Sequence, residues 1–344
     1  MRTKAVAIVL ALLALSLSAR DAHSQLLING AGATFPYPIY SQWFDQYAKA
    51  NPNVRFNYQS IGSGGGIKQL LNRTVDFGAS DAPMNDQQLG QASDKVLHFP
   101  TVLGAVVITY NIPDFSGSLR LTGPVIADIF RGKITKWNDD AIAKLNPSAK
   151  LPDTAIVVCH RSDGSGTSYV FTDYLSKASP EWSKEVGKAT AVKWPVGLGG
   201  KGNEGVTALV QQTPGGIGYI ELIYAVQNKL PYADIQSHDG EWVKPSIDTV
   251  TAAASGAAAN MPSDFRVSIT DAPGANAYPI SSFTYLLVYQ QQGDAAKGKA
   301  IKEFIKWMLD SGQQDAAPLS YAPLPASVIT AERMQLNKVA VSGD

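Results

Sequence analysis

The sequence offers little to metal, disulfide or nucleophilic chemistry. Cys159 is its one cysteine, so no internal disulfide can form and the hydrophobic core must hold the fold alone. The four histidines include no metal-binding pair of the H-E-x-x-H kind, and no serine stands in a G-x-S-x-G nucleophile elbow. Because a serine without a base or a metal is a poor nucleophile, a hydrolase is disfavoured. We expect no catalysis, no cofactor and no metal.

An excess of charge of either sign is also missing. The chain of 344 residues has 29 lysines and arginines against 29 aspartates and glutamates. This balance argues against a nucleic-acid partner or an anionic membrane surface. A chain with 45% hydrophobic and 17% charged residues should fold into a soluble globular protein, long enough here for two domains. Any anion site in it must concentrate positive potential locally.

The apolar run at the N-terminus is too short to cross a bilayer comfortably. Arg2 and Lys4 precede the run, which covers residues 5–17, and Ala22-His23-Ser24 follow it. This order is typical of a secretory signal peptide, here residues 1–24, although an uncleaved anchor is the alternative. No cysteine stands at the cleavage site to carry a lipid. We therefore predict a periplasmic protein.

Short apolar strands alternate with amphipathic helices along the remaining chain, which predicts an α/β fold. We expect three strands that each lead through a glycine-rich turn into a helix. Hydroxyl residues mark the three helix starts, namely Thr34, Ser63, and Ser165 with Thr167. The first N–H groups of a helix lack internal partners and bind anions well, although serine and threonine at a single helix start are more often plain helix caps. Convergence of all three would predict an anion site.

Two further features favour an oxyanion. Arg161 follows a predicted strand and offers a planar fork of donors, which Asp163 could orient. Asp81 is the second feature, since a carboxylate rejects a fully ionised anion but accepts a hydrogen bond from one that still carries a proton. The alternative for Asp81 is a helix cap for residues 83–89. We expect Arg161 and nearby donors to hold the pKa of Asp81 down against the effect of burial.

Five stretches of the sequence are distinctive: GAGATFPYPIY (Gly30 to Tyr40), YQSIGSGGGIKQL (Tyr58 to Leu70), VDFGASDAPM (Val75 to Met84), RSDGSGTS (Arg161 to Ser168) and KWPVGLGGKGNEG (Lys193 to Gly205). In this order they resemble the periplasmic phosphate-binding proteins of the high-affinity phosphate ABC transporter. The likeness runs from about Leu27 to the Pro323-Leu324-Pro325 region. One departure is Gly64, where this family often has a second serine or threonine.

The resemblance implies a two-lobe Venus-flytrap fold of the type II periplasmic-binding-protein class, with a hinge and a ligand cleft between the lobes. Lobe I would comprise residues 25–103 and 278–344, and lobe II residues 104–277, with crossings near residues 102–105 and 275–279. The implied partners are inorganic phosphate and a membrane permease, and we expect a monomer. The phosphate ligands carried over by motif are Thr34, Phe35, Ser63, Asp81, Arg161, Ser165, Gly166 and Thr167, with Asp163 supporting the arginine.

Three alternatives stay open at this point. Another tetrahedral anion that keeps a proton, such as arsenate, satisfies the same reasoning, and a phosphatase is the enzymatic alternative. The loop Gly197 to Gly202 invites comparison with a nucleotide-binding loop, but Gly202 replaces the hydroxyl that such a loop requires. We expect this loop to be a structural turn.

Overall fold

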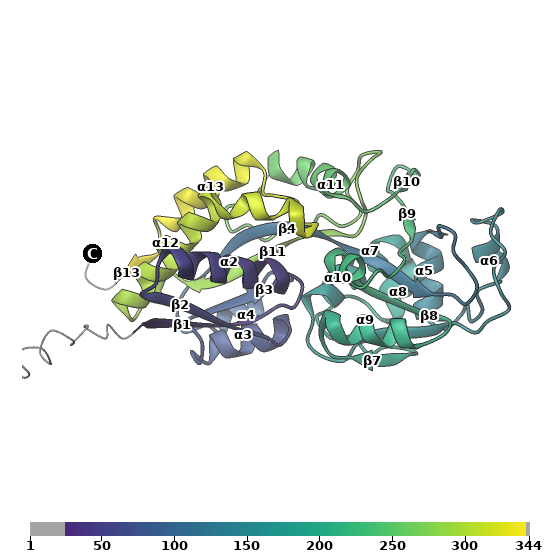
Figure 1. Ribbon diagram of the computed structural model, residues 1–344, viewed down its shortest axis with the longest axis horizontal. Helices are drawn as coiled ribbons and strands as arrows, with labels where there is room; N and C mark the ends of the chain where they lie inside the picture. The colour runs from purple at the N-terminus through teal and green to yellow at the C-terminus, as the bar shows by residue number, and fades with distance from the viewer. Residues whose placement is uncertain (1–24, 260, 342–344) are drawn as a thin grey trace, which may run out of the picture.

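The computed structural model describes residues 25–259 and 261–341 as two α/β lobes lying side by side along the long axis (Figure 1). The predicted signal peptide lies outside the described residues. We call lobe I the part that holds β1, β2, β3 and β11, and lobe II the part that holds β6, β7 and β8. The strands of the largest sheet are β1 (Leu26–Gly32), β2 (Val54–Ser60), β3 (Phe77–Ser80), β4 (Val96–Asn111), β6 (Val157–Arg161), β7 (Leu198–Gly200), β8 (Gly216–Glu221) and β11 (Ser281–Tyr289).

This sheet is continuous through both lobes. Its order is β2-β1-β3-β11-β4-β8-β6-β7, and β4 is the strand that the lobes share. Residues 96–105 of β4 pair with β11 in lobe I, whereas residues 106–111 pair with β8 in lobe II. Within each lobe the outer strands run parallel, as β1 does with β2 and β3, and β6 with β7 and β8. Parallel strands bring their carboxyl ends to one edge, where α/β proteins bind ligands.

Lobe I packs its helices around an aromatic core. The rings of Phe44, Phe56 and Phe304 lie with centroids 4.6–5.2 Å apart, so α2 and α12 are both fixed to β2. Pro38 sits in the first turn of α2, where its missing N–H has no acceptor to lose. The helical segments are α2 (Tyr37–Ala50), α3 (Ser63–Leu71), α4 (Asp86–Gly90), α12 (Ala295–Asp310), α13 (Ala326–Leu336) and the 3₁₀ turns η1 (Gly312–Asp315) and η2 (Ala317–Leu319).

Lobe II has a second aromatic core, in which Phe171 stacks on Tyr219 at 4.3 Å and joins α7 to β8. Its helices are α5 (Gly123–Phe130), α6 (Asp140–Ala143), α7 (Gly166–Ala178), α8 (Pro180–Glu185), α9 (Gly202–Gln212) and α10 (Leu222–Gln227). The described residues also form two small sheets. One consists of β5 (Arg120–Leu121), β9 (Asp234–Gln236) and β10 (Trp242–Val243), and the other of β12 (Gln291–Gln292) and β13 (Ala340–Val341).

The two predicted crossing segments lie against each other. The N–H of Val106 donates to Ile280 O at 2.8 Å, and the Tyr278 hydroxyl donates to Val106 O at 3.0 Å. A third connection comes from α11 (Ile247–Ala259), which packs on β4, β11 and α13 although it precedes residue 278. Residues 252–259 form the greater part of this 13-residue helix. The division into lobes at residues 103/104 and 277/278 stays a proposal.

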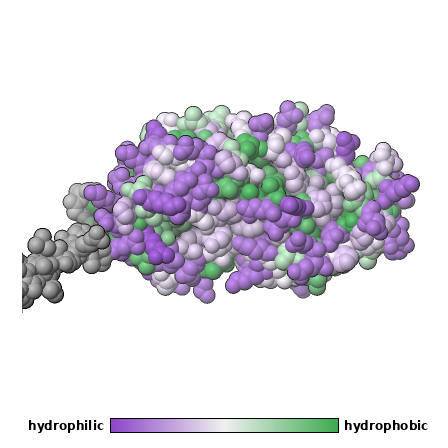
Figure 2. Space-filling view, in the orientation of Figure 1, coloured by the Kyte–Doolittle hydropathy of each residue, from purple (hydrophilic) through white to green (hydrophobic). Residues whose placement is uncertain are grey.

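The surface view in Figure 2 is dominated by hydrophilic residues, with hydrophobic ones gathered mainly near the middle of the molecule. Large hydrophobic side chains that are well exposed are few among the described residues: Leu27, Tyr37, Val196, Leu198, Val226 and Met334. No helix in the described part of the chain is both long and apolar enough to span a bilayer.

Candidate functional site between the lobes

The three predicted hydroxyl-bearing turns meet in the structure. Ser63 Oγ, at the start of α3, accepts a hydrogen bond of 3.0 Å from the N–H of Gly166, at the start of α7 in the other lobe. The same oxygen accepts a longer bond of 3.3 Å from the N–H of Asp81. The third turn follows β1, and the Thr34 hydroxyl within it contacts lobe II through Asn203. The predicted residues therefore lie together at the junction of the lobes.

The turn after β1 presents two backbone donors with fixed directions. The carbonyl of Ala33 accepts from the Tyr58 hydroxyl at 2.8 Å, and that of Thr34 accepts from the Tyr224 hydroxyl at 2.5 Å. In a trans peptide the N–H points away from the preceding carbonyl, so these tyrosines also fix the N–H groups of Thr34 and Phe35. Within the described residues, neither N–H donates a hydrogen bond. The turn can therefore supply two donors to an anion.

Arg161 ends β6 and is only 3% exposed. Its Nε and Nη2 atoms donate to the two carboxylate oxygens of Asp163 at 2.8 and 2.6 Å, and the N–H of Gly202 donates to Asp163 at 3.0 Å. Burial would raise the pKa of Asp163, but the hydrogen bonds and charge of Arg161 hold it below its ordinary value. The Nη1 atom of Arg161 is buried without a hydrogen-bond partner in the described part of the chain. The predicted Arg161–Asp163 pair thus leaves one buried donor unused.

The start of α7 lies opposite Ser63 and Asp81. Ser165 is its N-cap, and its Oγ accepts from the N–H of Ser168 at 2.9 Å. The cap function therefore holds for Ser165, and it leaves the hydroxyl hydrogen free to donate. A Cβ on Gly166 would lie 2.4 Å from Ser63 Oγ and 2.6 Å from Asp81 Oδ2, so only glycine fits there. Ser165, Gly166 and Thr167 are all buried.

Asp81 follows β3 and is 1% exposed. Its Oδ1 accepts a hydrogen bond of 2.8 Å from the Thr284 hydroxyl in β11. Burial raises the pKa of Asp81 to about 7, against smaller lowering effects of Thr284, Arg161 and Thr167. The expectation of a depressed pKa was wrong, because the hydrogen bonds of Arg161 go to Asp163. The helix-cap alternative was wrong too, since α4 begins at Asp86 and Asn85 caps it.

Gly64, the residue that departs from the family pattern, lies where two backbones meet. Its N–H donates to Gly164 O of lobe II at 2.8 Å. A Cβ on Gly64 would lie 3.1 Å from the Cα of Gly164, which is tighter than ordinary van der Waals contact. Two facing glycines thus let the lobes approach closely beside Ser63.

Sequence reasoning missed five residues that support this site: Thr284, Asn203, Tyr58, Tyr224 and Tyr321, the last of which donates its hydroxyl to Phe35 O at 2.6 Å. They are distant in the chain from the turns they contact, so no local spacing marks them. Asn203 falls within the stretch Lys193 to Gly205 that carries the resemblance, but the glycine loop before it gave no indication of its contacts. That loop forms edge strand β7 and leads into α9.

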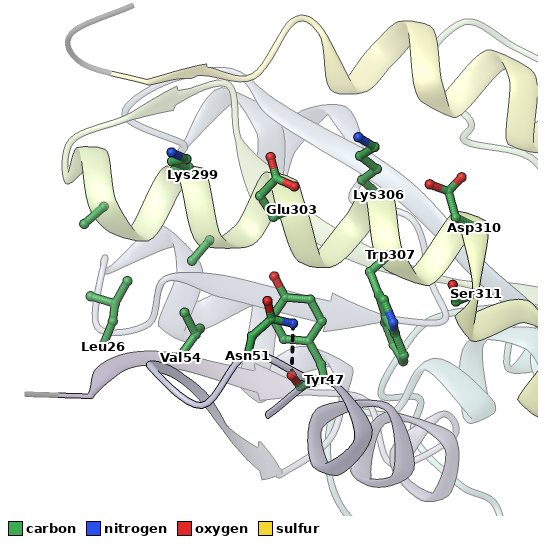
Figure 3. A pocket seen from close by; sticks show the side chains of 12 residues that line it. Leu26, Tyr47, Asn51, Val54, Lys299, Glu303, Lys306, Trp307, Asp310 and Ser311 are labelled. Carbon is green, nitrogen blue, oxygen red and sulfur yellow. Dashed lines mark hydrogen bonds between the residues drawn. The ribbon is translucent and has the colours of Figure 1, made fainter. Parts of the chain in front are cut away.

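The pocket in Figure 3 is a different feature, a surface groove of about 450 Å³ between the start of β2 and α12. Its walls combine aromatic Tyr47 and Trp307 with Lys299, Glu303, Lys306 and Asp310, so charges of both signs alternate along it. None of the predicted residues lines it. Among the described residues, no cluster of three histidine, cysteine or acidic side chains could hold a metal ion.

Comparison with known proteins agrees with the fold. A model described as the PBP superfamily domain matches residues 18–311. The phosphate-binding protein PstS of Xylella fastidiosa (strain 9a5c) is 50% identical over 303 residues, covering 88% of this chain and 82% of that protein.

Two solved structures share the fold. The phosphate-binding protein from Stenotrophomonas maltophilia has a TM-score of 0.67 at 21% identity, covering 90% of this chain and 93% of that one. The ABC-type phosphate transport receptor from Vibrio cholerae has a TM-score of 0.56 at 18% identity, covering 87% and 100%. The predicted two-lobe fold is confirmed, and the chain belongs to the PstS family of phosphate-binding proteins within the PBP superfamily.

Proposed function

We propose that this chain binds one inorganic phosphate between its lobes and delivers it to an ABC transporter. The observation that carries this proposal is the buried Nη1 of Arg161, which has no partner among the described residues and lies in a junction lined by other donors. A buried charged donor without a partner is costly, and an oxyanion would satisfy it. The names of the Xylella fastidiosa and Vibrio cholerae proteins support phosphate as that anion and transport as its purpose.

The proposed ligands divide between the lobes. Lobe I would contribute the N–H groups of Thr34 and Phe35, the Ser63 hydroxyl and the carboxylate of Asp81. Lobe II would contribute Arg161 together with the helix start formed by Ser165, Gly166 and Thr167. An anion that contacts both lobes stabilises the closed form over any form in which they separate.

Asp81 would distinguish phosphate from sulfate. At neutral pH phosphate keeps a proton that it can donate to a carboxylate, whereas sulfate has none to give. A site built around such a hydrogen bond rejects the analogue that lacks it by about 10⁴-fold. Arsenate also keeps a proton, so Asp81 would not exclude it.

Titration calorimetry on residues 25–344 tests the function. We expect phosphate to bind with a stoichiometry of one, arsenate to compete, and sulfate to be rejected at pH 8. Replacement of the unused donor, in Arg161→Met, should abolish binding at micromolar phosphate. Sulfate binding as tight as that of phosphate would refute the proposal.

We also propose a periplasmic monomer without catalytic activity. The PstS family consists of binding proteins, and the buried hydroxyls at the junction have no histidine within hydrogen-bonding reach among the described residues. An assay with a phosphomonoester should give no turnover, and sedimentation should give the mass of one chain with or without phosphate.

A further inference from the structure

Asn203 connects both lobes through a single buried side chain. It is the second residue of α9 and has no exposed surface. Its Nδ2 donates to Thr34 Oγ1 of lobe I at 2.7 Å and to Thr167 Oγ1 of lobe II at 3.2 Å. Its Oδ1 accepts from the N–H of Glu221 at 2.9 Å. The amide therefore joins the turn after β1, the start of α7 and the end of β8.

The orientation of this amide is dictated by its partners. The N–H of Glu221 can only donate, so the atom that faces it must be the amide oxygen. The amide NH₂ group then faces the two threonine hydroxyls, and an NH₂ group can only donate. Both hydroxyl oxygens consequently act as acceptors toward Asn203. Thr34 Oγ1 accepts a second bond of 3.2 Å from the backbone N–H of Asn203, which fills both of its lone pairs.

This pattern decides where the hydroxyl hydrogens point. With both lone pairs of Thr34 Oγ1 engaged, its hydrogen must point away from Asn203. The Thr167 hydroxyl accepts from Asn203 as well, so its hydrogen also points away from the Asn203 amide. A bound oxyanion accepts hydrogen bonds, so hydroxyls held as donors in the closed form are organised to bind it.

We propose that Asn203 is a positioning residue for phosphate binding, which holds Thr34 and Thr167 as hydrogen-bond donors. The inference rests on the proposed function, but it assigns Asn203 a part that does not require contact with the anion. Because Thr34 and Asn203 belong to different lobes, the donor arrangement is complete only when the lobes meet. Asn203 should therefore slow the release of phosphate as well as strengthen its binding.

Asn146 provides a matched control for the experiment. It is also a buried asparagine of lobe II, with its amide bonded to the backbone of Arg120 and Ile142 at 2.8–2.9 Å, and none of these residues belongs to the site. In calorimetry, Asn203→Ala should raise the Kd for phosphate about tenfold or more, the effect of losing one hydrogen bond to a charged group. Asn146→Ala should lower the thermal midpoint and leave Kd unchanged. Stopped-flow release of phosphate should be faster only in Asn203→Ala.

A double-mutant cycle with Thr34→Val separates positioning from general damage. If Asn203 acts through the Thr34 hydroxyl, the loss caused by Asn203→Ala should be at least about threefold smaller in the Thr34→Val background. Additive losses, or a Kd in Asn203→Ala that equals that of Asn146→Ala, would overturn the inference.

A third variant keeps the inference testable should Asn203→Ala fail to fold. Asn203→Asp keeps the shape and the acceptor for Glu221, but its second oxygen would accept from the hydroxyls and turn them away from the anion. A wild-type Kd in this variant also overturns the inference. Failure of the wild-type chain to bind phosphate would instead refute the proposed function.

Discussion

The carboxyl group of Asp81 is buried and accepts a hydrogen bond from the hydroxyl of Thr284. The nearby Arg161 makes no hydrogen bond to it, because its Nε and Nη2 atoms donate to Asp163 instead. Arg161 therefore acts on Asp81 through its charge alone, and burial prevails in setting the pKa. The sequence could place Arg161 and Asp163 two residues apart, but it could not show that Asp163 would take both Nε and Nη2. The consequence is a carboxyl group that titrates near neutral pH in the free protein.

Replacing this carboxylate by an amide should relax selectivity. Asp81→Asn keeps the acceptor for Thr284 and offers an NH₂ group to an oxygen that has no proton. We expect phosphate to bind within about tenfold of the wild-type Kd, while most of the sulfate rejection of about 10⁴-fold disappears. Competition calorimetry at pH 8 measures both values. Unchanged discrimination would exclude Asp81 as the selective group.

Selectivity should also depend on pH in the wild-type protein. Below the raised pKa of about 7, Asp81 carries a proton and can itself donate to sulfate. We therefore expect sulfate to compete measurably at pH 5.5 and to lose this ability at pH 8, while Asp81→Asn shows no such change. A sulfate Kd that is independent of pH would contradict this assignment of the proton.

The same pKa shift predicts how stability varies with pH in the absence of phosphate. The unfolded chain releases the Asp81 proton near 3.8, but the folded protein keeps it until about pH 7. The contribution of this group to stability is thus full below pH 3.8 and is lost as pH rises through 7. At pH 8, Asp81→Asn should have a free energy of unfolding up to about 4 kcal/mol above wild type, and the two should converge near pH 4. Urea titrations at the two pH values measure the difference.

Helix starts are the elements on which the site depends, and their hydroxyl and glycine residues were readable from the sequence. Hydrophobic periodicity also indicated that strands alternate with helices, because a half-buried element repeats its apolar residues at a fixed interval. Periodicity is weak in α11, where alanine and glycine leave little contrast between faces and packing on β4 and β11 supplies the order.

Glycine-to-alanine substitutions in two helices should affect different properties, phosphate affinity in one helix and fold stability in the other. Gly166→Ala places a methyl group against Ser63 and Asp81, so we expect phosphate affinity to fall at least about 100-fold because the lobes cannot meet. Gly256 in α11 has no atom within 4 Å of an added Cβ. Gly256→Ala should leave Kd unchanged and stabilise the fold by about 0.5–1 kcal/mol, through helix propensity alone. Wild-type binding by Gly166→Ala would show that the closed contact is not needed.

At the scale of the whole molecule, the resemblance supplied the lobes and the proposed hinge, whereas composition bounded only the class of protein. What no local pattern revealed is that both lobes share a single sheet. Val106 and Ile280 stand side by side, so the chain next to the two proposed crossings is hydrogen-bonded into the sheet rather than free as two loose linkers.

A shared sheet should make unfolding cooperative across the lobes. Separate domains joined by linkers melt independently, whereas loss of β4 removes pairing from both halves at once. We expect one calorimetric transition, shifted upward by phosphate with a stabilisation of about 2.7 kcal/mol at a concentration of 100 times Kd. Two resolved transitions in the free protein would contradict this expectation.

The strand that runs from Val96 to Asn111 also limits how the protein could be dissected. A fragment that begins after residue 105 and runs to the C-terminus would contain β11 but lack residues 96–105, which would leave β11 with an unpaired flank. Exposed edges of this kind invite aggregation. A sensor or a fusion built from this molecule should therefore carry both lobes intact. New segments should be inserted at surface turns such as residues 238–240 rather than in the strand that the lobes share.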